Sequence, residues 1–109
     1  MPVAQCFLTR LPETDLVARW SRLAGVEAEH MTLQLVKVDA QQGRPYEAMA
    51  WLQLPSLWSA EAVDRLQLGL ARALAEALDA PADRVMVLTS IVESGRVVEG
   101  GEVLRFETP

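Results

Sequence analysis

The strongest constraint on the fold is a segment of helical periodicity between residues 60 and 78. Ser59 is a good N-cap residue, and Glu61 is an acid in the favourable first turn. One apolar stripe follows the helical spacing and contains Val63, Leu66, Leu70, Ala73, Leu74, Ala77 and Leu78. A helix with one apolar stripe packs against another apolar layer, so the remaining segments are expected to supply that layer.

The rest of the chain is dominated by segments with strand character. We expect strands at residues 2–11, 30–38, 46–54 and 84–92, followed by short β-like pieces that reach Phe106. A short first helix is expected after an N-cap at Thr14 or Asp15, and Gly25 stands where that helix should stop. The order β-α-β, β-α-β and a terminal hairpin predicts an α/β (α+β) fold with two helices on one face of a four-stranded mixed sheet.

The two halves of the chain resemble each other faintly. Leu23 and Leu78 lead into their strands in the same way, at an offset of 55 residues, whereas Pro2 pairs best with Ala48 at an offset of 46. The difference of 9 residues corresponds to about two and a half helical turns that the first helix lacks. We therefore expect one domain over residues 1–109 that contains pseudo-repeats at about 2–45 and 46–103.

Composition and charge exclude several classes of function. The net charge of −5 disfavours nucleic acid or an anionic membrane as a partner, and no apolar stretch approaches the roughly 18 residues of a membrane span. Cys6 and His30 are the only residues of their kinds, which excludes an internal disulfide and disfavours a metal site. No secretory signal is visible. We expect a soluble cytoplasmic protein without a cofactor.

The strand expected at 84–92 indicates self-assembly. Its residues 85–88, Val-Met-Val-Leu, are apolar on both faces of the strand. Helices can cover only one of these faces, so the other face needs an apolar partner. A homo-oligomer that packs sheet against sheet would provide it.

The second residue is the main functional candidate. If Met1 is removed, Pro2 becomes a secondary amine fixed at the start of a strand. A free α-amine titrates near about 7.7–8.0, and partial burial or neighbouring arginines lower that value. An amine with such a pKa can act as a general base near neutral pH.

Several motifs together resemble the tautomerase superfamily, which includes 4-oxalocrotonate tautomerase and macrophage migration inhibitory factor. The resemblance covers about residues 48–103, through Ser59-Ala60-Glu61, Leu78-Asp79-Ala80-Pro81, Val85-Met86-Val87, Gly95 and Gly100-Gly101-Glu102. The first half matches through Pro2-Val3-Ala4-Gln5. Length and duplication are similar to the fused, two-unit members, and a bacterial branch of similar length is the nearest type.

The resemblance implies a homotrimer in which Pro2 moves protons next to the carbonyl group of a small 2-keto or enol acid. It also implies arginines that bind the substrate carboxylate. Arg10 shares the strand face of Pro2, and Arg96 lies between the terminal glycines, where the family pocket lies. Lys37 is the single lysine and stands in an apolar strand, where it either lines the pocket or extends to solvent.

Two alternatives remain open at this point. Family positions that often carry functional side chains fall here on Pro12, Val26, Met86 and Val97. This favours a catalytically inactive member that serves as a structural or small-molecule-binding oligomer. The other alternative is a dimeric ferredoxin-like binding module, because that fold has the same order of elements.

Overall fold

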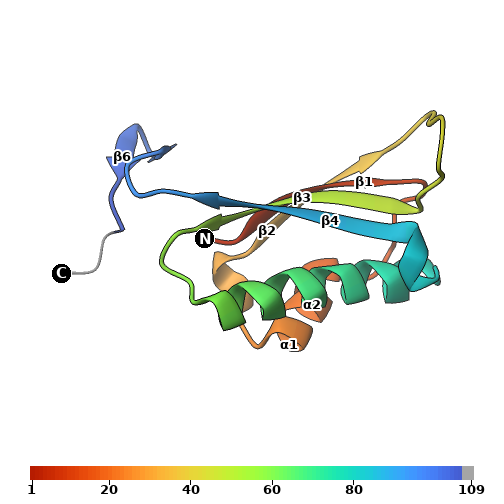
Figure 1. Cartoon of the computed structure of the whole chain (residues 1–109), viewed down its shortest axis with the longest axis horizontal. Coiled ribbons are helices and arrows are strands. Elements are labelled where there is room, and N and C mark those ends of the chain that lie inside the picture. Colours follow the sequence, from red (N-terminus) through yellow and green to blue (C-terminus); the bar gives the residue numbers. More distant parts are fainter. Residues whose placement is uncertain (107–109) are drawn as a thin grey trace.

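A computed structural model describes residues 1–106 as a sheet covered on one face by two helices (Figure 1). The first β-α-β unit contains β1 (Val3–Leu8), α1 (Leu16–Ala24) and β2 (Thr32–Lys37). The second contains β3 (Ala48–Pro55), α2 (Ala60–Leu78) and β4 (Val85–Val92). Short 3₁₀ turns, Ala28–His30 and Ala82–Arg84, precede β2 and β4, and a hairpin of β5 (Val97–Glu99) and β6 (Glu102–Leu104) follows.

The strand order of the main sheet is β2-β1-β3-β4. Within each unit the two strands are adjacent and parallel, and β1 and β3 join the units in antiparallel fashion. A ferredoxin-like module has a split β-α-β unit, in which another strand separates the two parallel strands. The observed order therefore excludes that alternative and confirms the four-stranded mixed sheet.

The helix boundaries follow the predicted signals closely. Asp15 is the N-cap of α1 and accepts a 3.0 Å hydrogen bond from the backbone N of Ala18, and Gly25 ends the helix at φ 69°. Ser59 caps α2 in the same way, through a 3.1 Å bond from Ala62 N. The helices have 9 and 19 residues, a difference close to the 9 residues inferred from the two offsets.

The strand ends depart from the prediction by a few residues. The 3₁₀ turn at residues 28–30 takes up His30, so β2 begins at Thr32, and the turn at 82–84 delays β4 by one residue to Val85. β1 ends at Leu8 rather than near residue 11, although Thr9 N still donates to Glu47 O at 3.0 Å. The alternation of apolar and polar residues continues beyond the last residue that pairs with a neighbouring strand, so the alternation does not show where a strand ends.

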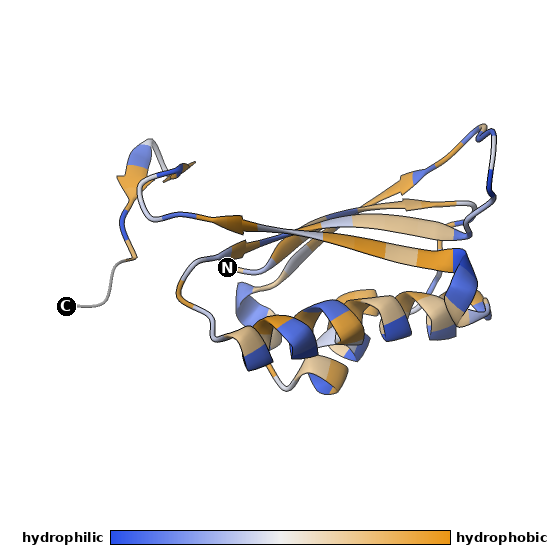
Figure 2. Ribbon diagram, viewed as in Figure 1, coloured by the Kyte–Doolittle hydropathy of each residue, from blue (hydrophilic) through white to orange (hydrophobic). Residues whose placement is uncertain are grey.

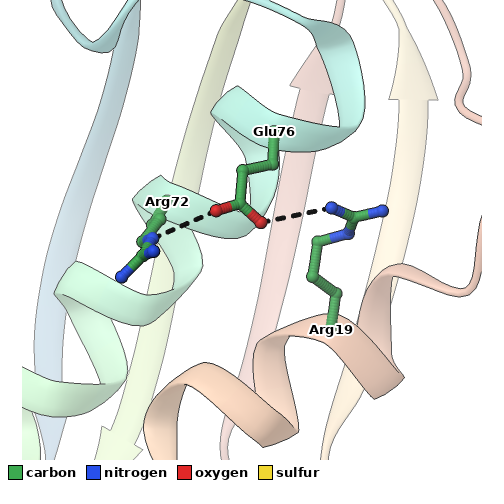
Figure 3. Close-up of polar contacts among 3 residues, drawn as sticks. All are labelled: Arg19, Arg72 and Glu76. Atoms are coloured by element: carbon green, nitrogen blue, oxygen red, sulfur yellow. Dashed lines mark hydrogen bonds and ion pairs between the residues drawn. The ribbon is translucent and has the colours of Figure 1, made fainter.

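The core lies between the sheet and the helices. Trp20 of α1 is fully buried, and its indole Nε1 donates a 2.9 Å hydrogen bond to the carbonyl of Leu66 in α2. The helices approach closely at Gly69, where an added Cβ would stand 3.2 Å from the backbone N of Ala24. Outside the core, Arg19 of α1 donates to Glu76 of α2 at 3.2 Å and so joins the two helices, while Arg72 donates to Glu76 at 3.0 Å within α2 (Figure 3). Hydrogen bonds from Arg72 and Arg19 lower the pKa of the Glu76 carboxyl.

Within residues 1–106, no helix or strand covers the face of the sheet opposite the helices. Phe7 and Trp51 lie on it in an edge-to-face contact, with ring centroids 5.2 Å apart. β4 is hydrophobic along much of its length (Figure 2), and its Leu88 is 43% exposed. None of the described helices is both long enough and apolar enough to cross a membrane.

Candidate functional site

Pro2 is held rigidly at the start of β1. Its ring is fully buried on the same side as Ala4, Cys6 and Leu8, and its carbonyl accepts a 3.1 Å hydrogen bond from the backbone N of Thr32. The alternation of β1 and the pairing with β2 therefore determine where the residue lies. The end of β3 runs beside it, because Val3 pairs with Gln53 in the antiparallel register.

A cavity of about 250 Å³ lies in front of this end of the sheet. The chain terminus, the end of β3 with its following loop, and the segment after β6 provide its wall, which consists of Met1, Pro55, Leu57, Leu104, Arg105 and Phe106. Five of these side chains are apolar and one is a cation. The cavity thus combines a mainly apolar surface with a single permanent positive charge.

The amino group of the chain lies at this cavity. The pKa of the Met1 amine is below its usual value because the group is partly buried, and the carboxylate of Glu99 acts in the opposite direction. While Met1 is attached, the nitrogen of Pro2 is an amide and cannot take up a proton. Removal of Met1 would place the amine on Pro2 and vacate the space that Met1 occupies in the cavity wall.

The terminal hairpin positions the cation. Gly95 N donates to the carbonyl of Leu104 at 2.9 Å, and Phe106 N donates to Ser94 Oγ at 3.0 Å, so hydrogen bonds flank Arg105 on both sides. The guanidinium crosses Gly95 closely, since a Cβ added there would stand 2.5 Å from Arg105 Nη1. Gly95 also has a φ of +85°, which favours glycine.

The structure separates the residues that the sequence predicted for one site. Arg10 and Lys37 lie at the far end of β1 and β2, and an eight-residue strand separation places the Cα of Arg10 about 25 Å from that of Pro2. Arg96 lies in the terminal hairpin near the Pro2 end, but it is exposed and is not part of the cavity wall. Within one chain, none of these basic residues lines the cavity at the terminus.

The environment of Arg10 is a different kind of cavity. Arg10 donates a hydrogen bond to the carbonyl of Leu78, at the C-terminal end of α2. The surrounding cavity, of about 480 Å³, also includes Glu47, Asp79 and Arg84. Arg84 in turn donates to the carbonyl of Pro45 at 3.1 Å. Two arginines and two acids therefore face this space, and both arginines already donate to backbone carbonyls.

Arg105 and Phe106 were not among the residues expected from the sequence. Val97 occupies a family position that often carries a functional side chain, but the aromatic residue in the cavity wall is Phe106. A signal was present, because Gly95 and Gly100-Gly101 mark a hairpin that returns the chain. In the observed register Val97 pairs with Leu104, which brings residues 105 and 106 back beside Gly95 and Ser94.

The remaining candidates have structural surroundings. Cys6 is fully buried, and burial raises the pKa of its thiol to about 12, so it is a protonated core residue. His30 is exposed, with its Nε2 3.4 Å from Glu29. Among residues 1–106, no three His, Cys, Asp or Glu side chains lie close enough to hold a metal ion.

Comparison with known proteins identifies the fold. No known family profile and no curated protein matches the chain by sequence. The native fused 4-OT structure matches with a TM-score of 0.73 and 20% identity, over 93% of this chain and 94% of the other. A member of the cis-3-chloroacrylic acid dehalogenase family also matches, with a TM-score of 0.68 and 19% identity, over 94% of this chain and 82% of the other. The macrophage migration inhibitory factor of Trichinella spiralis matches with a TM-score of 0.71 and 12% identity, over 94% of this chain and 99% of the other.

These matches establish the fold as that of the tautomerase superfamily, in agreement with the sequence resemblance. Two further structures of this fold also match. A fused 4-OT was solved as an asymmetric trimer (TM-score 0.74, 16% identity, 93% of this chain and 94% of the other). Another protein was solved after inactivation by 2-oxo-3-pentynoate, and it matches with a TM-score of 0.71 and 15% identity, over 94% of this chain and 94% of the other.

Proposed function

We propose that this protein is a tautomerase-like isomerase for a small 2-keto or enol acid, with Pro2 as general base once Met1 is removed. The observation that carries the proposal is the position of the chain terminus. Pro2 is held rigidly behind Met1, which lines a mainly apolar cavity, and partial burial lowers the pKa of the Met1 amine at this position. Partial exclusion of water favours a neutral amine at neutral pH.

The chemistry requires one proton acceptor and no redox partner. The neutral secondary amine of Pro2 accepts the hydroxyl proton of an enol acid as the carbonyl double bond forms. The resulting ammonium group then gives a proton to the carbon next to that carbonyl, which restores the neutral amine. A general base in this position contributes roughly 10²- to 10⁴-fold to the rate.

We also propose that the protein is a homotrimer, as in the fused 4-OT structure solved as a trimer. The uncovered face of the sheet, with Trp51 and Leu88, supports assembly because exposed apolar patches of this kind mark contact surfaces. In this assembly Arg96 would contact the substrate from the terminal hairpin of the chain that supplies Pro2. Arg10 and Lys37 would contact the substrate from a neighbouring subunit. A soluble, cytoplasmic location accords with a small acid as substrate.

The test compares one sequence in two processing states. Protein with Met1 retained and protein from which an aminopeptidase has removed it are assayed for ketonisation of small enol acids, with intact mass confirming each state. We expect activity only in the processed form and its loss in Pro2→Ala. Equal turnover in the two forms, or in Pro2→Ala, would contradict the role of Pro2.

A covalent probe gives a second readout. We expect 2-oxo-3-pentynoate, which inactivates one protein of this fold, to add to the amine of Pro2 in the processed form. Peptide mass spectrometry would locate the adduct. Labelling elsewhere, or equal labelling of the form that retains Met1, would count against a reactive Pro2 amine.

A catalytically inactive oligomer is the second candidate function, and one observation favours it. Met1 forms part of the cavity wall and leaves Pro2 as an amide, so the form that retains Met1 has no base at this position. If intact mass shows that Met1 is kept in cells, this candidate replaces the first.

A further inference from the structure

We propose that Arg105 is the carboxylate-binding and specificity-determining residue of the cavity at the chain terminus, and that the ligand is a monocarboxylate with a short apolar chain. The inference rests on the proposed function only for the reaction that follows binding. It concerns a residue of the same chain as Pro2, in contrast to Arg10 and Lys37. Its support comes from geometry, charge and size.

The geometry fixes Arg105 at the cavity. The hydrogen bonds from Gly95 N to Leu104 O and from Phe106 N to Ser94 Oγ close the hairpin on either side of it. Gly95 leaves open the space that the guanidinium crosses, because any side chain there would collide with Arg105 Nη1. The hairpin thus presents a planar, permanently charged group at the same cavity as the chain terminus.

The charges select a ligand with one carboxylate. Among the described residues, Arg105 is the single cationic side chain in the wall, and a guanidinium can bind one carboxylate through two parallel hydrogen bonds. A second carboxylate in the ligand would find no further basic side chain in this described wall.

The size and the remaining wall limit the rest of the ligand. The cavity measures about 250 Å³ while Met1 is attached, and removal of Met1 adds the space of one side chain, so the processed form still offers room only for a small ligand. Leu57, Leu104 and Phe106 offer apolar contact and no hydrogen-bonding side-chain group. A 2-oxo acid with a short alkyl chain matches these properties, whereas a dicarboxylate or a sugar acid does not.

The cavity around Arg10, of about 480 Å³, lacks these properties. The arginines at the opposite end of β1 donate to the carbonyls of Leu78 and Pro45, and Glu47 and Asp79 stand beside them. An anion there would meet two carboxylates and displace existing bonds. For this reason the inference concerns the terminal cavity.

Binding to the processed protein tests the proposal, with 2-oxobutanoate as the probe and calorimetry or NMR titration as the readout. We expect Arg105→Gln to weaken binding about 10- to 100-fold, since hydrogen bonds to charged groups have this weight. Arg105→Lys keeps the charge without the planar fork and should fall between the two. The matched control is Arg65→Gln, an exposed arginine of α2 that is not part of the cavity wall, and this variant should bind as the wild type does.

Two further ligands identify the group that Arg105 recognises. The methyl ester of 2-oxobutanoate should bind the wild type and Arg105→Gln equally, because it carries no charge. The dicarboxylate 2-oxoglutarate should bind the wild type more weakly than 2-oxobutanoate does. Equal affinity of wild type and Arg105→Gln for 2-oxobutanoate, or no saturable binding to the wild type, overturns the proposal.

The outcomes separate this inference from the proposed function. Binding that depends on Arg105 without any turnover supports the inference and contradicts the isomerase. Turnover that depends on Pro2, with affinity and KM unchanged in Arg105→Gln, supports the isomerase and overturns the inference.

Discussion

The two faces of the sheet differ although the same strands form both. Along β1, Ala4, Cys6 and Leu8 are fully buried against the helices, whereas Gln5 and Phe7 alternate with them on a face that has no cover. In β3 the consecutive residues Trp51 and Leu52 show the same contrast, at 38% and 0% exposure. The covered face completes the fold of one chain, whereas the open face leaves apolar side chains such as Trp51 exposed.

The candidate site residues are also divided, but between the two ends of the sheet. Pro2 and Arg105 lie at one end of the sheet, and Arg10 and Lys37 lie at the other, about 25 Å along the strand. A single chain cannot bring the two ends together. Contacts made by the open face are the available means of bringing them close, which ties the completeness of the proposed site to assembly.

The largest expected effect is the loss of assembly in Leu88→Glu. This residue is 43% exposed on the open face, and a carboxylate there would have to be buried in a sheet-to-sheet contact without a partner. We expect light scattering to show a monomer with an unchanged circular dichroism spectrum. Leu68→Glu is the control, because Leu68 is exposed on the outer side of α2. A Leu88→Glu protein that assembles normally would refute the role of the open face.

The next effect is a loss of stability in Leu52→Ala. Leu52 is fully buried beneath the helices, and truncation of such a side chain costs about 2–5 kcal/mol in the free energy of unfolding. Urea denaturation at a fixed protein concentration measures it, and Leu68→Ala should change stability by less than about 0.5 kcal/mol. Equal effects of the two truncations would show that the two faces are not distinguished by packing.

The sequence was sufficient for the elements and insufficient for the site. Ser59 and the apolar stripe predicted α2 at its observed bounds, because a cap and a helical period are local signals. Strand ends were less accurate, since 3₁₀ turns before β2 and β4 leave no periodic trace. Pro2 could be singled out by its position in the sequence. Arg105 lines the cavity beside Met1 because of the register of the hairpin, and register arises from pairing between segments.

A smaller effect, on activity, tests whether the two ends of the sheet combine between subunits. Arg10→Gln should lower turnover about tenfold if the residue binds the substrate at a neighbour's Pro2. Mixed with protein that retains Met1, it should regain activity, because some sites then combine a free Pro2 with an intact Arg10. Mixing each protein with wild type at the same ratio controls for exchange of subunits. No recovery on mixing would mean that Arg10 acts within its own chain.

A last effect is confined to alkaline pH, concerns the covered face and follows from Cys6. Burial raises the pKa of its thiol to about 12 in the folded chain, while an exposed thiol titrates near about 8.5. Above that lower value the unfolded chain loses the proton and the folded chain keeps it, so the unfolded state is favoured as pH rises. Stability should therefore fall by up to about 1.4 kcal/mol for each pH unit between about 9 and 12. Cys6→Ala carries a constant packing cost and lacks this titration, so its urea midpoints should decline less steeply over the same range. Parallel curves for the two proteins would place the thiol in contact with solvent and remove the contrast between the two faces of β1.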